Sequence, residues 1–292
     1  MGVGLVFTLP GLVLAAAALQ SFLALTNPRL RVMVSSAEVP LGASFDLAWA
    51  VSDAGRLRSL RVWLEGSESA DAFNNEPPGG GHGSHATFAT FPISEADRPG
   101  ERGSARVSVP ASTMHSFEAS ADANNKILWS IRFAGKSALL WGFWPATDVA
   151  YGITVLPVPV IPLSAEPSSV YVPGGALKGA VERIDGMLSI SIAPAPGPDR
   201  DDGGPDPTGE FEVRLGWRTR GKGNTDQDVV ATVKTGRDFW FRLPADGPYS
   251  FSGKLVSLVW AVEAERGSWP RKETVRQEFI LSPTGREIEL YR

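Results

Sequence analysis

Most of the sequence after residue 26 consists of short runs in which apolar and polar residues alternate, separated by glycine, proline and other turn residues. Runs of this kind are typical of strands that bury one face. No stretch of ten residues in this part has a convincing helical period. The pattern predicts an all-β protein built from sandwiches or barrels. Examples of these runs are ASFDLAWAV, SLRVWLEG, KILWSIRF and FEVRLGWRT.

One short sequence pattern, called the phrase below, occurs twice in the chain. In both copies a Pro-Ala pair is followed, six residues past the proline, by Ser-Phe, then by a lysine and an apolar run that contains tryptophan. The first copy contains Pro110, Ser116, Phe117, Lys126 and Trp129, and the second contains Pro244, Ser250, Phe251, Lys254 and Trp260. The repetition predicts two copies of one sandwich, with the phenylalanine closing one end of each.

A proline-rich segment separates the two copies. Residues 155–167 read VLPVPVIPLSAEP, and such proline spacing disfavours sheet pairing and favours an extended, semi-rigid connector. We therefore expect two tandem β-sandwich domains after an N-terminal transmembrane helix. The expected boundaries are 1–26 for the anchor, 27–157 for the first sandwich, 158–167 for the linker and 168–292 for the second sandwich.

The N-terminal segment from Val3 to Leu25 has 23 residues and no charge. As a helix it would span roughly 34 Å, enough to cross a hydrocarbon core. The alternative is a cleaved signal peptide, but no lysine or arginine precedes the apolar run. Arg29 and Arg31 follow it, which favours a single-pass protein of the bacterial inner membrane with the bulk of the chain in the cytoplasm.

Composition narrows the classes of function. The chain has no cysteine, which excludes thiol chemistry, disulfides and cysteine-ligated metal. Its net charge of −4, with scattered basic residues, argues against a nucleic-acid-binding protein. No Ser/His/Asp arrangement or convergent carboxylate pair is present, so we expect no enzyme and no cofactor.

Three stretches resemble chemical motifs. Residues 216–223 match a phosphate-binding loop except that Gly223 stands where Ser or Thr should bind magnesium, and a hairpin turn over residues 221–224 is the better interpretation. His82 and His85 lie three residues apart but lack further ligands, so we predict no metal site there. The acidic stretch 199–210 lacks the spacing of a calcium loop.

Tryptophan is unusually frequent in this chain, with nine residues. Some of them occupy alternating strand positions that predict core packing: Trp49, Trp63, Trp129, Trp217 and Trp260. A second group lies among glycine and proline, or at a hairpin tip, and is predicted to bind a partner if it is not folded back on the sandwich. This group consists of Trp141, Phe143, Trp144 and Trp269.

The second copy resembles bacterial arrestin-like proteins of the sporulation-control type, through WRTRGKGNTD, LPADGPYSFSGKLVSLVWAVEA and EFIL. The first copy, through PLGASFDLAWAV and NNKILWSIRF, resembles the soluble tail of an uncharacterised bacterial membrane protein family, in which paired sandwiches follow a transmembrane helix. The resemblance covers residues 27–292 and implies an arrestin-like fold and a scaffolding role. It supplies no catalytic residues. The aromatic stretch 137–152 and the glycine-rich stretch 74–87 depart from the family pattern.

These observations predict a non-catalytic, membrane-anchored scaffolding subunit of a larger membrane protein complex, for example a photosynthetic or respiratory one. Its partners would be the other subunits and, through residues 3–25, the lipid bilayer. Two alternatives remain at this point. One is a free-standing arrestin-like adaptor that recruits client proteins, and the other is an exported sandwich that binds carbohydrate.

Overall fold

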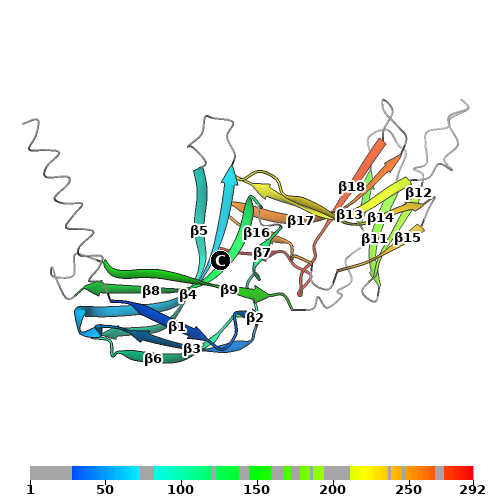
Figure 1. The fold of residues 1–292 in the computed structure, drawn as a ribbon. Coiled ribbons are helices and arrows are strands. Elements are labelled where there is room, and N and C mark those ends of the chain that lie inside the picture. The colour runs from blue at the N-terminus through cyan, green and yellow to red at the C-terminus, as the bar shows by residue number, and fades with distance from the viewer. Residues whose placement is uncertain are drawn as a thin grey trace, which may run out of the picture.

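The computed structural model describes residues 28–72, 82–119, 123–137, 145–158, 168–171, 178–184, 187–193, 211–235, 238–244, 247–266 and 273–291. Within these residues the chain is almost entirely β, with one short 3-10 helix, η1, at Ala54–Arg56. The strands form four sheets, arranged as two β units (Figure 1). This confirms the predicted all-β, sandwich-like fold.

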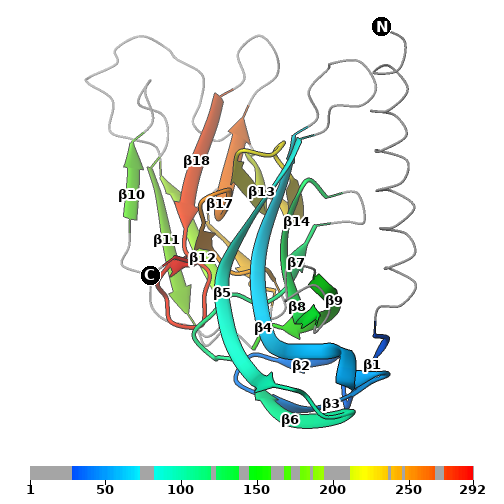
Figure 2. The same ribbon diagram turned by 90° about the vertical axis from the view of Figure 1, so that its left-hand side faces the viewer.

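The first β unit, residues 28–158, contains two sheets. The smaller has the order β1-β3-β6, formed by Leu30–Val34, Ser44–Val51 and Arg102–Ser108. The larger has the order β2-β9-β8-β4-β5, formed by Glu38–Pro40, Pro145–Leu156, Asn125–Ser137, Leu57–Ala72 and His82–Asp97, with β7 (Phe117–Glu118) paired to β8. Figure 2 shows the small sheet as a layer below β8 and β9.

The second β unit, residues 168–291, also contains two sheets. One has the order β10-β11-β12-β15, formed by Ser168–Tyr171, Lys178–Ile184, Met187–Ala193 and Asp238–Arg242. The other has the order β14-β13-β17-β16-β19, formed by Gln227–Thr235, Phe211–Gly221, Val256–Arg266, Phe251–Ser252 and Ile288–Glu289, with β18 (Glu273–Phe279) paired to β17.

The cores follow the alternation of the strands. In the first unit, Trp49 of β3 meets Phe133 of β8 edge to face, with 6.0 Å between ring centroids, so the two sheets face each other. Trp129, Trp217 and Trp260 are buried as predicted. Trp63 is not in the core, contrary to the prediction. Its neighbours on both sides, Val62 and Leu64, take the inner face, and side chains on a strand alternate between faces.

Two bulges interrupt the pairing of the long strand β4 with β5. The register shifts between Val62 and Trp63 and again between Gly66 and Ser67, and at each shift the extra residue belongs to β5. Bulges bend a strand and increase its twist. In Figure 1 the C-terminal half of β4 rises away from the first unit's lower sheet and comes close to β16 and β17 of the second unit. Glu68, in this half of β4, lies where the two units meet.

Two further expectations concern the ends of the domains. Val155 and Leu156, the first residues of the proline-rich segment, lie inside the expected first sandwich (27–157); they continue β9 and pair in parallel with Val39 and Pro40 of β2. Among the residues that the structure describes, no helix is long and apolar enough to cross a membrane. The predicted anchor, Val3 to Leu25, lies outside them.

Candidate functional site: the junction between the two β units

The repeated phrase builds the same local structure in both units. In the first unit, Ser116 donates its N–H to the Val155 carbonyl (2.8 Å), and its hydroxyl accepts from the Val155 N–H (2.9 Å). In the second, Ser250 donates to the Leu281 carbonyl (2.7 Å) and accepts from the Leu281 N–H (3.0 Å). The serine thus ties the phrase to a neighbouring strand in each copy.

The tryptophans of the phrase also match. The indole N–H of Trp129 donates to the Met114 carbonyl at 2.9 Å, and that of Trp260 donates to the Pro248 carbonyl at 2.7 Å. In both cases the acceptor stands two residues before the serine. Each buried indole therefore has its hydrogen-bond partner inside its own unit.

The two copies of the phrase contact each other through equivalent residues. Phe117 and Phe251, which follow the two serines, lie 6.4 Å apart between ring centroids, and both are buried. His115 and Tyr249, which precede the serines, pack edge to face at 4.5 Å. Equivalent residues that meet in this way describe an approximate two-fold relation between the units. The predicted end-closing phenylalanines are therefore the apolar centre of the junction.

Glu68 is the first of two carboxylates that cross the junction. Its side chain belongs to β4 of the first unit and has no exposed surface. It accepts hydrogen bonds from the backbone N–H groups of Lys254 (2.9 Å) and Val256 (3.0 Å) and from the hydroxyl of Tyr291 (2.5 Å). All three donors belong to the second unit. They supply the hydrogen bonds that a buried carboxylate requires.

Tyr291 is held in place from two sides. Burial, followed by the hydrogen bond to Glu68, raises the pKa of its hydroxyl, so the hydroxyl remains a donor. The ammonium group of Lys254 lies 3.9 Å from the centroid of its ring, a cation–π arrangement. The C-terminal segment that carries Tyr291 includes β19, which pairs in parallel with β16. This segment therefore links the second unit's sheet to the first unit's carboxylate.

Asp226 is the second carboxylate, and it crosses in the opposite direction. It lies on the β13–β14 turn of the second unit and accepts from the backbone N–H groups of Asn124 (3.1 Å) and Asn125 (2.8 Å) and from both of their side-chain amides. The amide of Asn125 also donates to the Thr219 hydroxyl at 2.9 Å. Each carboxylate thus binds the start of a central strand in the other unit, β17 for Glu68 and β8 for Asp226.

Two glycines allow this close approach. A β-carbon on Gly253 would lie 2.3 Å from a carboxylate oxygen of Glu68, and one on Gly223 would lie 2.5 Å from the amide oxygen of Asn125. Both distances are shorter than real contacts of this kind. Gly223 belongs to the stretch that resembles a phosphate-binding loop, and it lies in the turn between β13 and β14, as the hairpin interpretation predicted.

His115 is the buried titratable group of the junction. Burial lowers its pKa to about 4, so the ring is neutral near pH 7. Its Nδ1 lies 2.6 Å from the Ser116 carbonyl, and its Nε2 accepts from the Tyr249 N–H at 3.3 Å. The tautomer protonated on Nδ1 satisfies both contacts. Protonation of Nε2 would replace the acceptor by a donor facing a donor.

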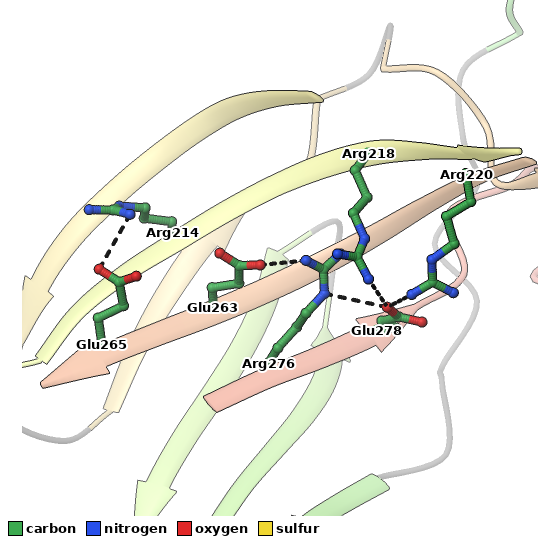
Figure 3. A network of polar contacts seen from close by, with 7 residues as sticks. All are labelled: Arg214, Arg218, Arg220, Glu263, Glu265, Arg276 and Glu278. Carbon is green, nitrogen blue, oxygen red and sulfur yellow. Dashed lines mark hydrogen bonds and ion pairs between the residues drawn. The ribbon is translucent and has the colours of Figure 1, made fainter. Parts of the chain in front are cut away.

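A second polar cluster covers the outer face of the second unit (Figure 3). Arg276 of β18 contacts Glu263 of β17 (2.5 Å) and Glu278 (3.4 Å), and Glu278 also contacts Arg218 (3.3 Å) and Arg220 of β13. Burial, followed by the nearby charge of Arg218, lowers the pKa of Arg276. Side chains of this cluster line a hollow of about 130 Å³ above Gly216 and Ala261.

The predicted partner-binding residues Trp141, Phe143, Trp144 and Trp269 lie outside the described residues, as does the acidic stretch 199–210. His85 is exposed on β5, opposite Ser69. Among the described residues, no group of three or more His, Asp or Glu side chains is arranged to hold a metal ion.

Sequence reasoning missed Glu68, Asn125 and Asp226 as members of one site. It did single out the two phrases that meet there.

Neither a scan against protein-family models nor a search of curated proteins found a match for this chain.

Proposed function

We propose that this protein is a non-catalytic scaffolding subunit, anchored in a membrane by residues 3–25, that binds other subunits of a membrane complex through the surfaces of its two β units. The observation that supports this function is the set of hydrogen bonds across the junction between the two β units. Glu68 and Asp226 each take their donors from the opposite unit, so the two units are held in one orientation. A fixed orientation allows two separate surfaces to bind neighbouring proteins without an ordering cost.

An arrestin-like architecture is part of the proposal. Its support is the duplication itself, in which equivalent serines, tryptophans and phenylalanines make equivalent contacts in each unit. The sequence of the second copy, from WRTRGKGNTD to EFIL, also resembles arrestin-like proteins. We further propose that the bulk of the chain lies on the cytoplasmic side of the membrane, from the charges of Arg29 and Arg31.

The partner surface that we propose includes Trp141, Phe143 and Trp144, between β8 and β9, and Trp269, between β17 and β18. Tryptophan and phenylalanine dominate the energetics of protein interfaces. Truncation of one such buried anchor costs about 2 kcal/mol or more, roughly a thirtyfold loss of affinity.

The test is purification of the tagged full-length chain in mild detergent, with mass spectrometry of the co-migrating proteins. We expect a defined set of membrane proteins, and we expect the triple alanine variant of Trp141, Phe143 and Trp144 to recover far less of it while keeping its melting temperature. A chain that elutes alone, and that alkali releases from the membrane pellet, contradicts the proposal. Unchanged recovery by the triple variant, together with a loss in Trp269→Ala, would move the interface to the second unit.

A further inference from the structure

One end of the first β unit gathers arginines. Six exposed arginines lie around the connection from β3 to β4 and around the loop between β5 and β6. They form the basic end: Arg29, Arg31, Arg56, Arg58, Arg98 and Arg102. The acidic residues in the same place are Asp53, Asp97 and Glu101. The basic end therefore has a formal charge of +3, in a chain whose net charge is −4.

Backbone contacts bring these segments together. Arg29 exchanges hydrogen bonds with Ser52, and the Val51 N–H donates to the Glu101 carbonyl at 2.8 Å. The Arg98 N–H donates to the Arg58 carbonyl, also at 2.8 Å. These contacts place the start of β1, the end of β3, the start of β4 and the start of β6 at one end of the unit. Figure 1 shows the start of β1 and the end of β8 at this same, left-hand end.

Register places two of the arginines on one face. Arg31 of β1 and Arg102 of β6 both stand opposite Ala50 of the central strand β3. Neighbouring strands lie about 4.8 Å apart, so their α-carbons are separated by about 10 Å across a small residue. Both side chains are exposed on the outer face of the sheet. Like charges at this spacing, with only alanine between them, leave room for an anionic group.

Most of these arginines lack an internal counter-charge. Within the described part of the chain, no ion pair involves five of them: Arg29, Arg31, Arg58, Arg98 and Arg102. By contrast, the arginines on the outer face of the second unit, such as Arg218 and Arg276, are paired with glutamates. The basic end is therefore a part of the described surface where several arginine charges lie close together and are left for an external anion.

The short distance in sequence between the uncharged N-terminal segment and the basic end indicates which anion binds there. Leu25, the last residue of the uncharged segment, precedes Leu30 at the start of β1 by five residues, which span at most about 17 Å when extended. If residues 3–25 cross a bilayer, the start of β1 lies within that distance of its surface, and the rest of the basic end lies beside the start of β1. Basic clusters beside a membrane anchor bind anionic lipid headgroups, and the excess negative charge elsewhere on the chain favours the same orientation.

We propose that the basic end docks on anionic phospholipid headgroups and thereby fixes the orientation of both β units relative to the membrane. This inference rests on the proposed anchor and adds the face that meets the bilayer. Each arginine near an anionic surface strengthens binding about fivefold. Reversal of the charge at three of these arginines should therefore lower the ratio of docked to undocked protein by roughly a hundredfold or more.

The experiment uses the full chain with one introduced cysteine, because the sequence has none of its own. Gly55 lies in η1 at the centre of the basic end, and a β-carbon there would meet nothing within 4 Å, so Gly55→Cys offers an open labelling position. Thr232→Cys, exposed on β14 of the second unit, is the matched control position. Each protein carries an environment-sensitive fluorophore and is reconstituted in nanodiscs of phosphatidylcholine, with or without phosphatidylglycerol.

We expect the label at position 55 to shift its emission to shorter wavelength and to resist iodide quenching only in discs that contain phosphatidylglycerol. High salt should reverse the change in the native chain, which tests the attraction without any substitution. The triple variant R31E/R58E/R102E should abolish it. The matched triple variant K234E/R242E/R286E, in the second unit, should retain it.

Failure of the docking differs from failure of the anchor. A chain that does not co-elute with nanodiscs refutes the anchor and, with it, the docking. A chain that co-elutes but whose label at position 55 ignores lipid charge overturns the docking and leaves the anchor standing. A response to duplex DNA in phosphatidylcholine discs as large as the response to phosphatidylglycerol assigns the basic end to nucleic acid and also overturns the proposal.

Discussion

Replacement of Glu68 by glutamine tests whether the buried carboxylate holds the two β units together. One carboxylate oxygen accepts from the Lys254 N–H and the Tyr291 hydroxyl, and the other accepts from the Val256 N–H. Glutamine keeps the size of the side chain but has only one acceptor oxygen. Its NH₂ group must therefore face a donor in either orientation of the amide.

The expected loss follows from the contacts. With the amide oxygen toward Lys254 and Tyr291, the N–H of Val256, a residue that is 1% exposed, has no acceptor. An unsatisfied buried donor, together with loss of the charge from the remaining bonds, costs about 2 kcal/mol. Glu68→Ala removes every acceptor and should cost about 3–5 kcal/mol. For a protein of this size, 2 kcal/mol lowers the melting temperature by about 4 °C.

The assay is thermal and urea unfolding of the full chain in nanodiscs, followed by tryptophan fluorescence and by circular dichroism. Glu95→Gln is the matched control, since Glu95 forms only an exposed ion pair with Arg61 and such pairs contribute little. We expect the native chain to unfold in one transition and Glu68→Ala to unfold in two, because its units no longer stabilise each other. Equal melting temperatures for Glu68→Gln and Glu95→Gln would refute the role assigned to Glu68.

Two further predictions concern the same junction. Gly253→Ala should lower the free energy of unfolding by about 1–3 kcal/mol, because its β-carbon would lie 2.3 Å from Glu68. Gly55→Ala is the control, since its β-carbon meets open space. Equal urea midpoints for the two variants would contradict this prediction. Burial lowers the pKa of His115 to about 4 from an ordinary value of 6.5. Its contribution to the free energy of unfolding is therefore complete above pH 6.5 and is lost as the pH falls toward 4, by up to about 3 kcal/mol. His115→Phe keeps the ring contact with Tyr249 and should remove this part of the pH dependence; a variant with the native slope between pH 6.5 and 4 would refute it.

The sequence predicted those features of the fold that depend on residues close together in the chain. Alternation in ASFDLAWAV placed Trp49 in the core, and the repeated phrase marked the residues that build matching contacts in the two units. The prediction for Trp63 was wrong because alternation shows which residues share a face but not which face is inward; Val62 and Leu64 take the inner face. The parallel pairing of Val155 with β2 could not be predicted, because its partner strand lies more than a hundred residues earlier in the sequence.

The polar members of the junction were beyond sequence reasoning for a different reason. Glu68 stands in LEGSESA, a stretch of small and charged residues that reads as solvent-exposed. Its burial results from contact with the second unit, where the backbone N–H group of Lys254, 186 residues away in sequence, donates to it. Asp226 lies on a turn, where carboxylates are usually solvated, and its donors are 101 and 102 residues distant. Long-range contacts of this kind leave no periodic signal.

The two halves of the junction follow one plan with different residues. In the first unit the carboxylate lies on the strand, as Glu68; at the register position equivalent to it, the second unit has Thr219, and the carboxylate lies on the adjoining turn, as Asp226. The two units therefore differ in sequence at these positions while each still caps the start of the other's central strand. It follows that neither strand start is complete within its own unit. Separation would leave the N–H groups of Asn125 and Val256 without their carboxylate acceptors and would expose Phe117 and Phe251 to water. The repeated phrase is thus best understood as two halves of one interface, which the chain needs in both copies because each half is the other's partner.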